Sequence, residues 1–186
     1  QFGAITLSAI GSTFLILIGG FLFARNYWKR DYAPLIFLIV LFGTWLDPID
    51  HTGYTTPTTS LFSIAYPYAS ALGMGFFSWW LALRSLHVNK HLWLYGAGLA
   101  ALTFLMFTSH QLQAVFGIGM TGAFVLFTPG GANWKRRLIL CSALILGLLA
   151  TRWWLYFDPI AYVLNPSVQS GHDAERFLTY SFENID

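Results

Sequence analysis

The sequence predicts an all-α integral membrane protein with six transmembrane helices, and three observations support this fold class. Hydrophobic residues make up 56% of the 186 residues and charged residues only 10%, against about 25% charged residues in ordinary soluble domains. Six apolar segments approach the length of about 20 residues that crosses a bilayer as a helix. Only short polar or basic linkers separate these segments.

The composition also argues against several classes of protein. The net charge of +2 is small and the basic residues are scattered, so nucleic acid is not an expected partner. Cys141 is the only cysteine, which excludes a disulfide within the chain and a metal site built from cysteines. Lysines and carboxylates are absent from the middle of every predicted span, and this pattern disfavours a retinal protein or a proton pump.

The first three predicted spans cover residues 3–24, 33–46 and 61–83. A basic linker, residues 25–31, follows the first span. The second span is short and leads into residues 51–60, whose Thr, Gly and Pro residues favour turns. Because Pro67 removes a backbone hydrogen bond, the third span is predicted to kink near its outer end.

The second half of the chain is predicted to supply the other three spans. As one helix, residues 92–127 would be about 54 Å long, so this stretch is predicted to form two spans that meet at the polar segment 109–113. The sixth span covers residues 138–157. Residues 1–157 are therefore expected to form the transmembrane domain, and residues 158–186, which are too polar to cross again, an extracytoplasmic C-terminal tail.

The charges predict the orientation of the six spans. Eight of the ten Lys and Arg residues fall in loops on one side, which the positive-inside rule assigns to the cytoplasm. Seven of the eight acidic residues fall on the opposite side, with Asp31 as the exception. Both termini are then extracytoplasmic, and the expected location is a plasma membrane or a bacterial inner membrane.

Small residues recur at spacings that allow helices to approach closely. Ala65, Ala69 and Gly73 do so in the third span, and Gly119 and Ala123 in the fifth. Close packing within the chain is the favoured interpretation, and a dimer interface is the alternative.

The outer ends of the predicted spans carry the side chains best suited to binding a metal or to acid/base chemistry. Carboxylates and imidazoles suit zinc, copper or iron, so one divalent transition metal is the possible cofactor. The alternative is that Asp47 and Asp158, each followed by proline, cap short helices. The candidate metal ligands are Asp47, Asp50, His51, His110 and Asp158.

Three further polar residues belong to the same predicted layer. Arg152, Gln111 and Gln113 are candidates for binding a substrate, with Arg152 holding an anionic group. An arginine near the bilayer interior usually pairs or faces a polar cavity. The alternative is that its side chain extends to the outer interface.

Two functions remain open on these observations. The first is an integral subunit of a larger membrane protein complex, which contacts membrane lipids and other membrane-protein subunits through its helix faces and outer tail. The second is a membrane enzyme that acts on a lipophilic substrate at the outer interface through the metal or acid/base residues named above. The catalytic residues and the substrate are not specified by any motif.

Overall fold

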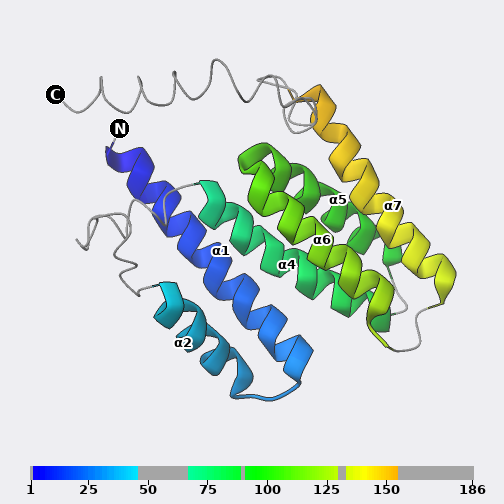
Figure 1. Ribbon diagram of the computed structural model, residues 1–186, viewed down its shortest axis with the longest axis horizontal. Coiled ribbons are helices and arrows are strands. Elements are labelled where there is room, and N and C mark those ends of the chain that lie inside the picture. Colours follow the sequence, from blue (N-terminus) through cyan, green and yellow to red (C-terminus); the bar gives the residue numbers. More distant parts are fainter. Residues whose placement is uncertain (1, 46–66, 89–90, 130–132, 155–186) are drawn as a thin grey trace.

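A computed structural model describes residues 2–45, 67–88, 91–129 and 133–154, which are almost entirely helical. Figure 1 shows the helices side by side, with successive helices running in opposite directions. This confirms the predicted all-helical fold for the described part of the chain. The helices are α1 (Phe2–Trp28), α2 (Ala33–Trp45), α4 (Pro67–His87), α5 (Leu92–Ser109), α6 (Gln111–Phe127) and α7 (Trp134–Ala150), followed by the 3₁₀ helix η1 (Thr151–Trp153).

The helix boundaries follow local sequence signals. The predicted break in the long apolar stretch is confirmed at His110, which separates α5 from α6. Pro67 is the first residue of α4, a position where proline fits because that N–H has no helical partner. The kink expected near Pro67 stays a prediction, because residues 61–66 of the predicted third span lie outside the described residues. Helix α7 begins four residues earlier and ends before the expected residue 157.

Among the described residues, two helices are both long and apolar enough to cross a membrane, namely the segment Thr6–Trp28 of α1 and the whole of α5. Helix α6 is also apolar but is 17 residues long.

Helix α4 lies at the centre of the bundle, where it packs against α1, α5 and α6 (Figure 1). Helix α7 packs mainly on α5, whereas α2 packs along α1 at the edge of the bundle. Three apolar clusters fill the spaces between these helices, the largest two between α1 and α4 and among α4 to α7. Their fully or nearly fully buried members include Ile16, Phe23, Phe76 and Trp79 in the first cluster, Leu86, Leu99, Val125 and Leu140 in the second, and Met74, Met106 and Phe107 in the third.

Glycines set the closest helix contacts. A Cβ added at Gly73 of α4 would lie 2.6 Å from the Leu15 Cβ of α1. A Cβ at Gly147 of α7 would collide with the backbone of Ala100 in α5. Ala69 is also buried against α1, so the prediction of close packing within the chain holds for Ala69 and Gly73, while Ala65 lies outside the described residues.

The polar side chains that are fully buried in the described bundle all carry hydroxyl groups. Ser12 of α1 and Ser70 of α4 lie 2.7 Å apart, Oγ to Oγ, and form a hydrogen bond between the two helices. Thr121 donates to the carbonyl oxygen of Gly117 within α6 at 2.7 Å. The buried set is Ser12, Ser78, Ser85, Thr103, Thr121 and Thr151.

Candidate functional site

The predicted outer site lies only partly within the described residues. His110, Gln111, Gln113 and Arg152 are described. The structure brings the region around His110 and η1 to the same end of the bundle, because η1 packs against α5. Four candidates lie outside the described residues, namely Asp47, Asp50, His51 and Asp158. Their presence at this end of the bundle therefore stays a prediction.

His110 has a structural role as the N-cap of α6. Its backbone is extended, with φ −158° and ψ 103°, and its N–H donates to the carbonyl oxygen of Met106 at the end of α5. Its Nδ1 atom accepts a hydrogen bond from the backbone N–H of Gln113 at 3.3 Å. The neutral imidazole then carries its proton on Nε2. A metal at Nδ1 would compete with this cap, so Nε2 is the atom that a ligand role would use.

Gln111 and Gln113 lie in the first turn of α6, and both side chains are half-buried. Their position beside His110 places two amide groups at the α5–α6 junction. A role in binding a substrate stays a prediction.

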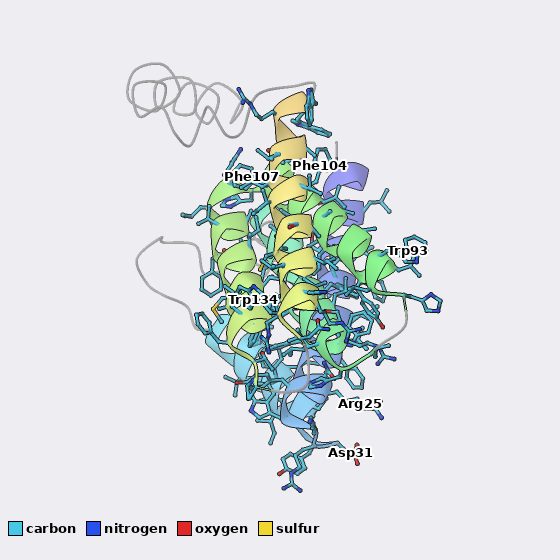
Figure 2. All side chains as sticks on the ribbon, turned by 90° about the vertical axis from the view of Figure 1, so that its right-hand side faces the viewer. Arg25, Asp31, Trp93, Phe104, Phe107 and Trp134 are labelled. Carbon is cyan, nitrogen blue, oxygen red and sulfur yellow. The ribbon has the colours of Figure 1, made fainter. Side chains whose placement is uncertain are left out.

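Arg152 belongs to η1 and has an exposed side chain. The 3₁₀ helix is held in place by Thr151, whose hydroxyl donates to the Leu148 carbonyl oxygen at 2.6 Å. The Trp154 ring meets the Phe104 ring of α5 edge to face, with centroids 5.5 Å apart. Figure 2 shows Phe104 and Phe107 at this end of the bundle. The α7 end is thereby tied to α5, and Arg152 is placed at the bundle's outer rim.

Metal binding finds no support in the described ranges. No three His, Cys, Asp or Glu side chains gather there in a way that could hold an ion. Of the five predicted ligands only His110 lies in these ranges, and the zinc, copper or iron site therefore stays a prediction.

Two arginines at the opposite end of the bundle have a role that the sequence analysis missed. Arg136 donates to the carbonyl oxygens of Leu86 and Val88 at the end of α4, at 3.5 and 2.8 Å. Arg137 donates to the last carbonyl oxygens of α6 and to that of Thr128, the latter at 2.9 Å. Carbonyl groups at a helix C-terminus have no helical donor and carry partial negative charge, so these guanidinium groups cap two neighbouring helices at once.

A sequence signal for this role exists in α7 itself. Three cations, residues 135–137, occupy its first turn, where the helix dipole disfavours positive charge. Basic residues in that position need compensation from elsewhere, and the ends of α4 and α6 supply it. We name the bonds of Arg136 and Arg137 to these carbonyls the arginine clamp.

An aromatic cluster near the same end joins four helices. The Phe23 ring of α1 lies within 5.2–6.3 Å, centroid to centroid, of six other rings. Trp79 of α4 also donates from its indole Nε1 to the Gly117 carbonyl oxygen of α6 at 3.1 Å. The rings pack on each other in edge-to-face and stacked arrangements, which stabilise protein interiors. The cluster consists of Phe23, Tyr27, Trp28, Phe37, Phe76, Trp79 and Phe124.

Comparison with known proteins gives no functional assignment: no protein-family model, curated protein or solved structure matches this chain.

Proposed function

We propose that this chain is a six-span integral membrane subunit of a larger membrane protein complex. The supporting observation is the distribution of side chains over the bundle. The buried polar residues of the described ranges are serines and threonines, whereas large apolar side chains cover the outside of the helices. Exposed examples on five different helices are Phe14, Leu35, Trp93, Leu112 and Leu146. A helix bundle in water would bury these groups, and lipid tails tolerate them.

The aromatic and charged residues agree with a membrane environment. Trp28, Trp93, Trp134 and Trp153 lie at helix ends and are 48–80% exposed, as in the aromatic belts of membrane proteins. The basic residues of the described ranges, apart from Arg152, lie at the end of the bundle that carries the α1–α2 turn. This supports the orientation with that end in the cytoplasm and both termini outside.

The outer face of α6 supports a contact with another membrane helix. A Cβ added at Gly119 or Gly122 would meet nothing within 4 Å. The exposed side chains of Leu112, Val115 and Phe116 continue this face along the helix. Small residues flanked by large apolar ones let a second helix approach closely in a membrane, and no helix of this chain occupies that position in the described structure.

The test is partner recovery from the native membrane in a mild detergent. We expect the wild-type chain to copurify with other membrane proteins in fixed ratio and Gly119→Leu/Gly122→Leu to lose them. The matched control is Gly11→Leu on α1, where an added Cβ is equally unobstructed, and it should retain the partners. A wild-type chain that is recovered alone would contradict the proposal.

Metal content in the same samples tests the alternative of a membrane enzyme. For a non-catalytic subunit we expect no stoichiometric zinc, copper or iron, and the same partners for wild type and Asp50→Ala/His51→Ala. About one metal ion per chain, lost in that double variant, would instead identify the outer cluster as a metal site.

A further inference from the structure

The end of α1 presents three cations whose side chains are not engaged by the part of the fold that the structure describes. Arg25 lies in the last turn of α1, and Lys29 and Arg30 follow the helix. All three side chains are exposed, and within the described residues they make no hydrogen bond or ion pair. Figure 2 shows Arg25 and Asp31 at the lower end of the bundle, with the Arg25 side chain pointing away from it. The three cations outnumber Asp31, the one acidic residue between α1 and α2.

The backbone holds these cations close together. The N–H of Lys29 donates to the Arg25 carbonyl oxygen at 3.2 Å, and Lys29 has a left-handed φ of 52°. This ends α1 with a tight turn, and the N–H of Ala33 donates to the Arg30 carbonyl oxygen at 3.2 Å as α2 begins. The turn is thus constrained by hydrogen bonds at both of its ends.

Three other basic residues at this end, Arg84, Arg136 and Arg137, have partners inside the protein. The arginine clamp engages Arg136 and Arg137 with helix carbonyls. Arg84 lies over the Trp80 ring, with its Cζ atom 5.8 Å from the ring centroid. The α1–α2 turn is different because its positive charge is clustered and is offered to a ligand.

Apolar and aromatic surface adjoins these cations directly. Tyr27, Trp28 and Tyr32 are 48–61% exposed within the turn. Beyond them the outer faces of α1 and α2 continue as exposed aliphatic and aromatic side chains, which are Phe14, Ile18, Phe21, Leu35, Ile36 and Ile39. An acidic peptide would match the cations but not the adjoining apolar and aromatic surface. A phospholipid matches the cations, the Trp and Tyr side chains and the apolar helix faces together. Its phosphate favours cations, its interfacial region favours Trp and Tyr, and its acyl chains need apolar surface.

We propose that the α1–α2 turn binds the headgroup of an anionic phospholipid, with Arg25, Lys29 and Arg30 on the phosphate and the acyl chains along α1 and α2. This rests on the proposed membrane embedding of these helices. The ligand is a lipid of the leaflet on the side of the α1–α2 turn, which is the cytoplasmic side in the proposed orientation.

The test compares lipid retention by native mass spectrometry after mixing the purified chain with phosphatidylglycerol or with phosphatidylcholine. The variants are Arg25→Gln/Lys29→Gln and the control Arg84→Gln/Lys135→Gln, which removes the same charge from the same end. We expect wild type and control to prefer phosphatidylglycerol, and the first variant to lose that preference on the order of 30-fold. Equal retention of both lipids by wild type, or equal losses in the two variants, would overturn the proposal.

Two further readouts separate the possible failures. Displacement of phosphatidylglycerol by inorganic phosphate at millimolar concentration would overturn the proposal in favour of a bare phosphate site. Alkaline extraction of native membranes tests the embedding on its own. Release of wild type by alkali would refute the membrane-subunit proposal, whereas a chain that stays in the membrane and shows no lipid preference would refute only the headgroup site.

Discussion

At the scale of single residues, the bundle contains buried hydroxyls of two kinds. Thr121 donates to the Gly117 carbonyl oxygen, whereas the Oγ1 atom of Thr103 and the Oγ atom of Ser78 are buried without a hydrogen-bond partner among the described residues. A buried hydroxyl without a partner costs about 1–3 kcal/mol of stability. Thr103 lies at the α5–α7 interface, because its Cβ is 2.9 Å from the position that a Cβ added at Gly147 of α7 would take.

This difference predicts opposite effects for two substitutions of equal shape. Thr103→Val removes a polar group that lacks a partner, so the free energy of unfolding should rise by about 1 kcal/mol. Thr121→Val removes a bonded hydroxyl and should lower it by about 0.5–1.5 kcal/mol. Thermal unfolding of both variants in one detergent checks the pair. Equal destabilisation would mean that the Thr103 hydroxyl has a bonding partner in the folded protein.

Arg137 is the second residue whose role can be measured alone. It reaches three carbonyl groups, on Val125, Leu126 and Thr128. Because hydrogen bonds from a charged donor are worth about 1.5–3 kcal/mol, Arg137→Gln should lower the free energy of unfolding by about 2–3 kcal/mol. The control is Lys135→Gln, which removes the same charge from the same turn. A denaturant titration that gives the same midpoint for both variants would show that the clamp contributes no stability.

At the scale of helices, the α5–α7 interface depends on one glycine. A Cβ at Gly147 meets both the carbonyl oxygen and the Cα of Ala100, with the Cα 2.9 Å away. Backbone atoms cannot move aside as a flexible side chain would. We therefore expect Gly147→Leu to force α7 away from α5 and to lower the free energy of unfolding by about 3 kcal/mol or more.

The control for this interface is Gly11→Leu on the open face of α1, where nothing lies within 4 Å of the added Cβ. Leucine has a better helix propensity than glycine, so this variant should be unchanged or slightly more stable. Thermal unfolding distinguishes the two cases. A Gly147→Leu chain as stable as the control would mean that α7 does not pack on α5 as described.

Local sequence signals identified most helix positions but not every end. The polar residues around His110 correctly divided one long apolar stretch into α5 and α6. Helix α1 runs past the predicted residue 24 to Trp28, because a basic last turn suits a helix C-terminus and hydropathy alone does not mark the end. The arginine clamp could not be derived from spacing, since Arg136 and the carbonyls it binds are 48 and 50 residues apart.

At the scale of the whole molecule, the sequence predicts less of the candidate site than of the fold. The predicted membrane depth of His110 and Arg152 puts both at one end of the bundle, and the contact between α5 and η1 agrees with this. The sequence pattern does not indicate that the His110 ring caps α6, because that role depends on the extended backbone at one residue. Four of the five predicted metal ligands belong to segments outside the described residues, so their chemistry rests on the sequence alone.

The orientation of the bundle can be tested by thiol labelling in intact cells. On a Cys141→Ser background, Ser181→Cys should react with a membrane-impermeant reagent, because the C-terminal tail is predicted to be extracytoplasmic. Asp31→Cys, in the exposed turn between α1 and α2, should react only after the membrane is opened. The reverse labelling pattern would show that the orientation is opposite to the proposed one and that the arginine clamp lies on the outer side.

The arginine clamp also bears on the order in which the protein is assembled. Both guanidinium groups belong to α7, whereas the carbonyl groups that they bind end α4 and α6. During synthesis from the N-terminus, those two helices are complete before the clamp residues exist. Their C-terminal carbonyl groups must then find other hydrogen-bond donors, such as water, until α7 is made. A chain that ends before residue 136 would keep the described helices α1, α2, α4, α5 and α6 but leave both of these ends open, so packing of α7 is the step that closes the described bundle.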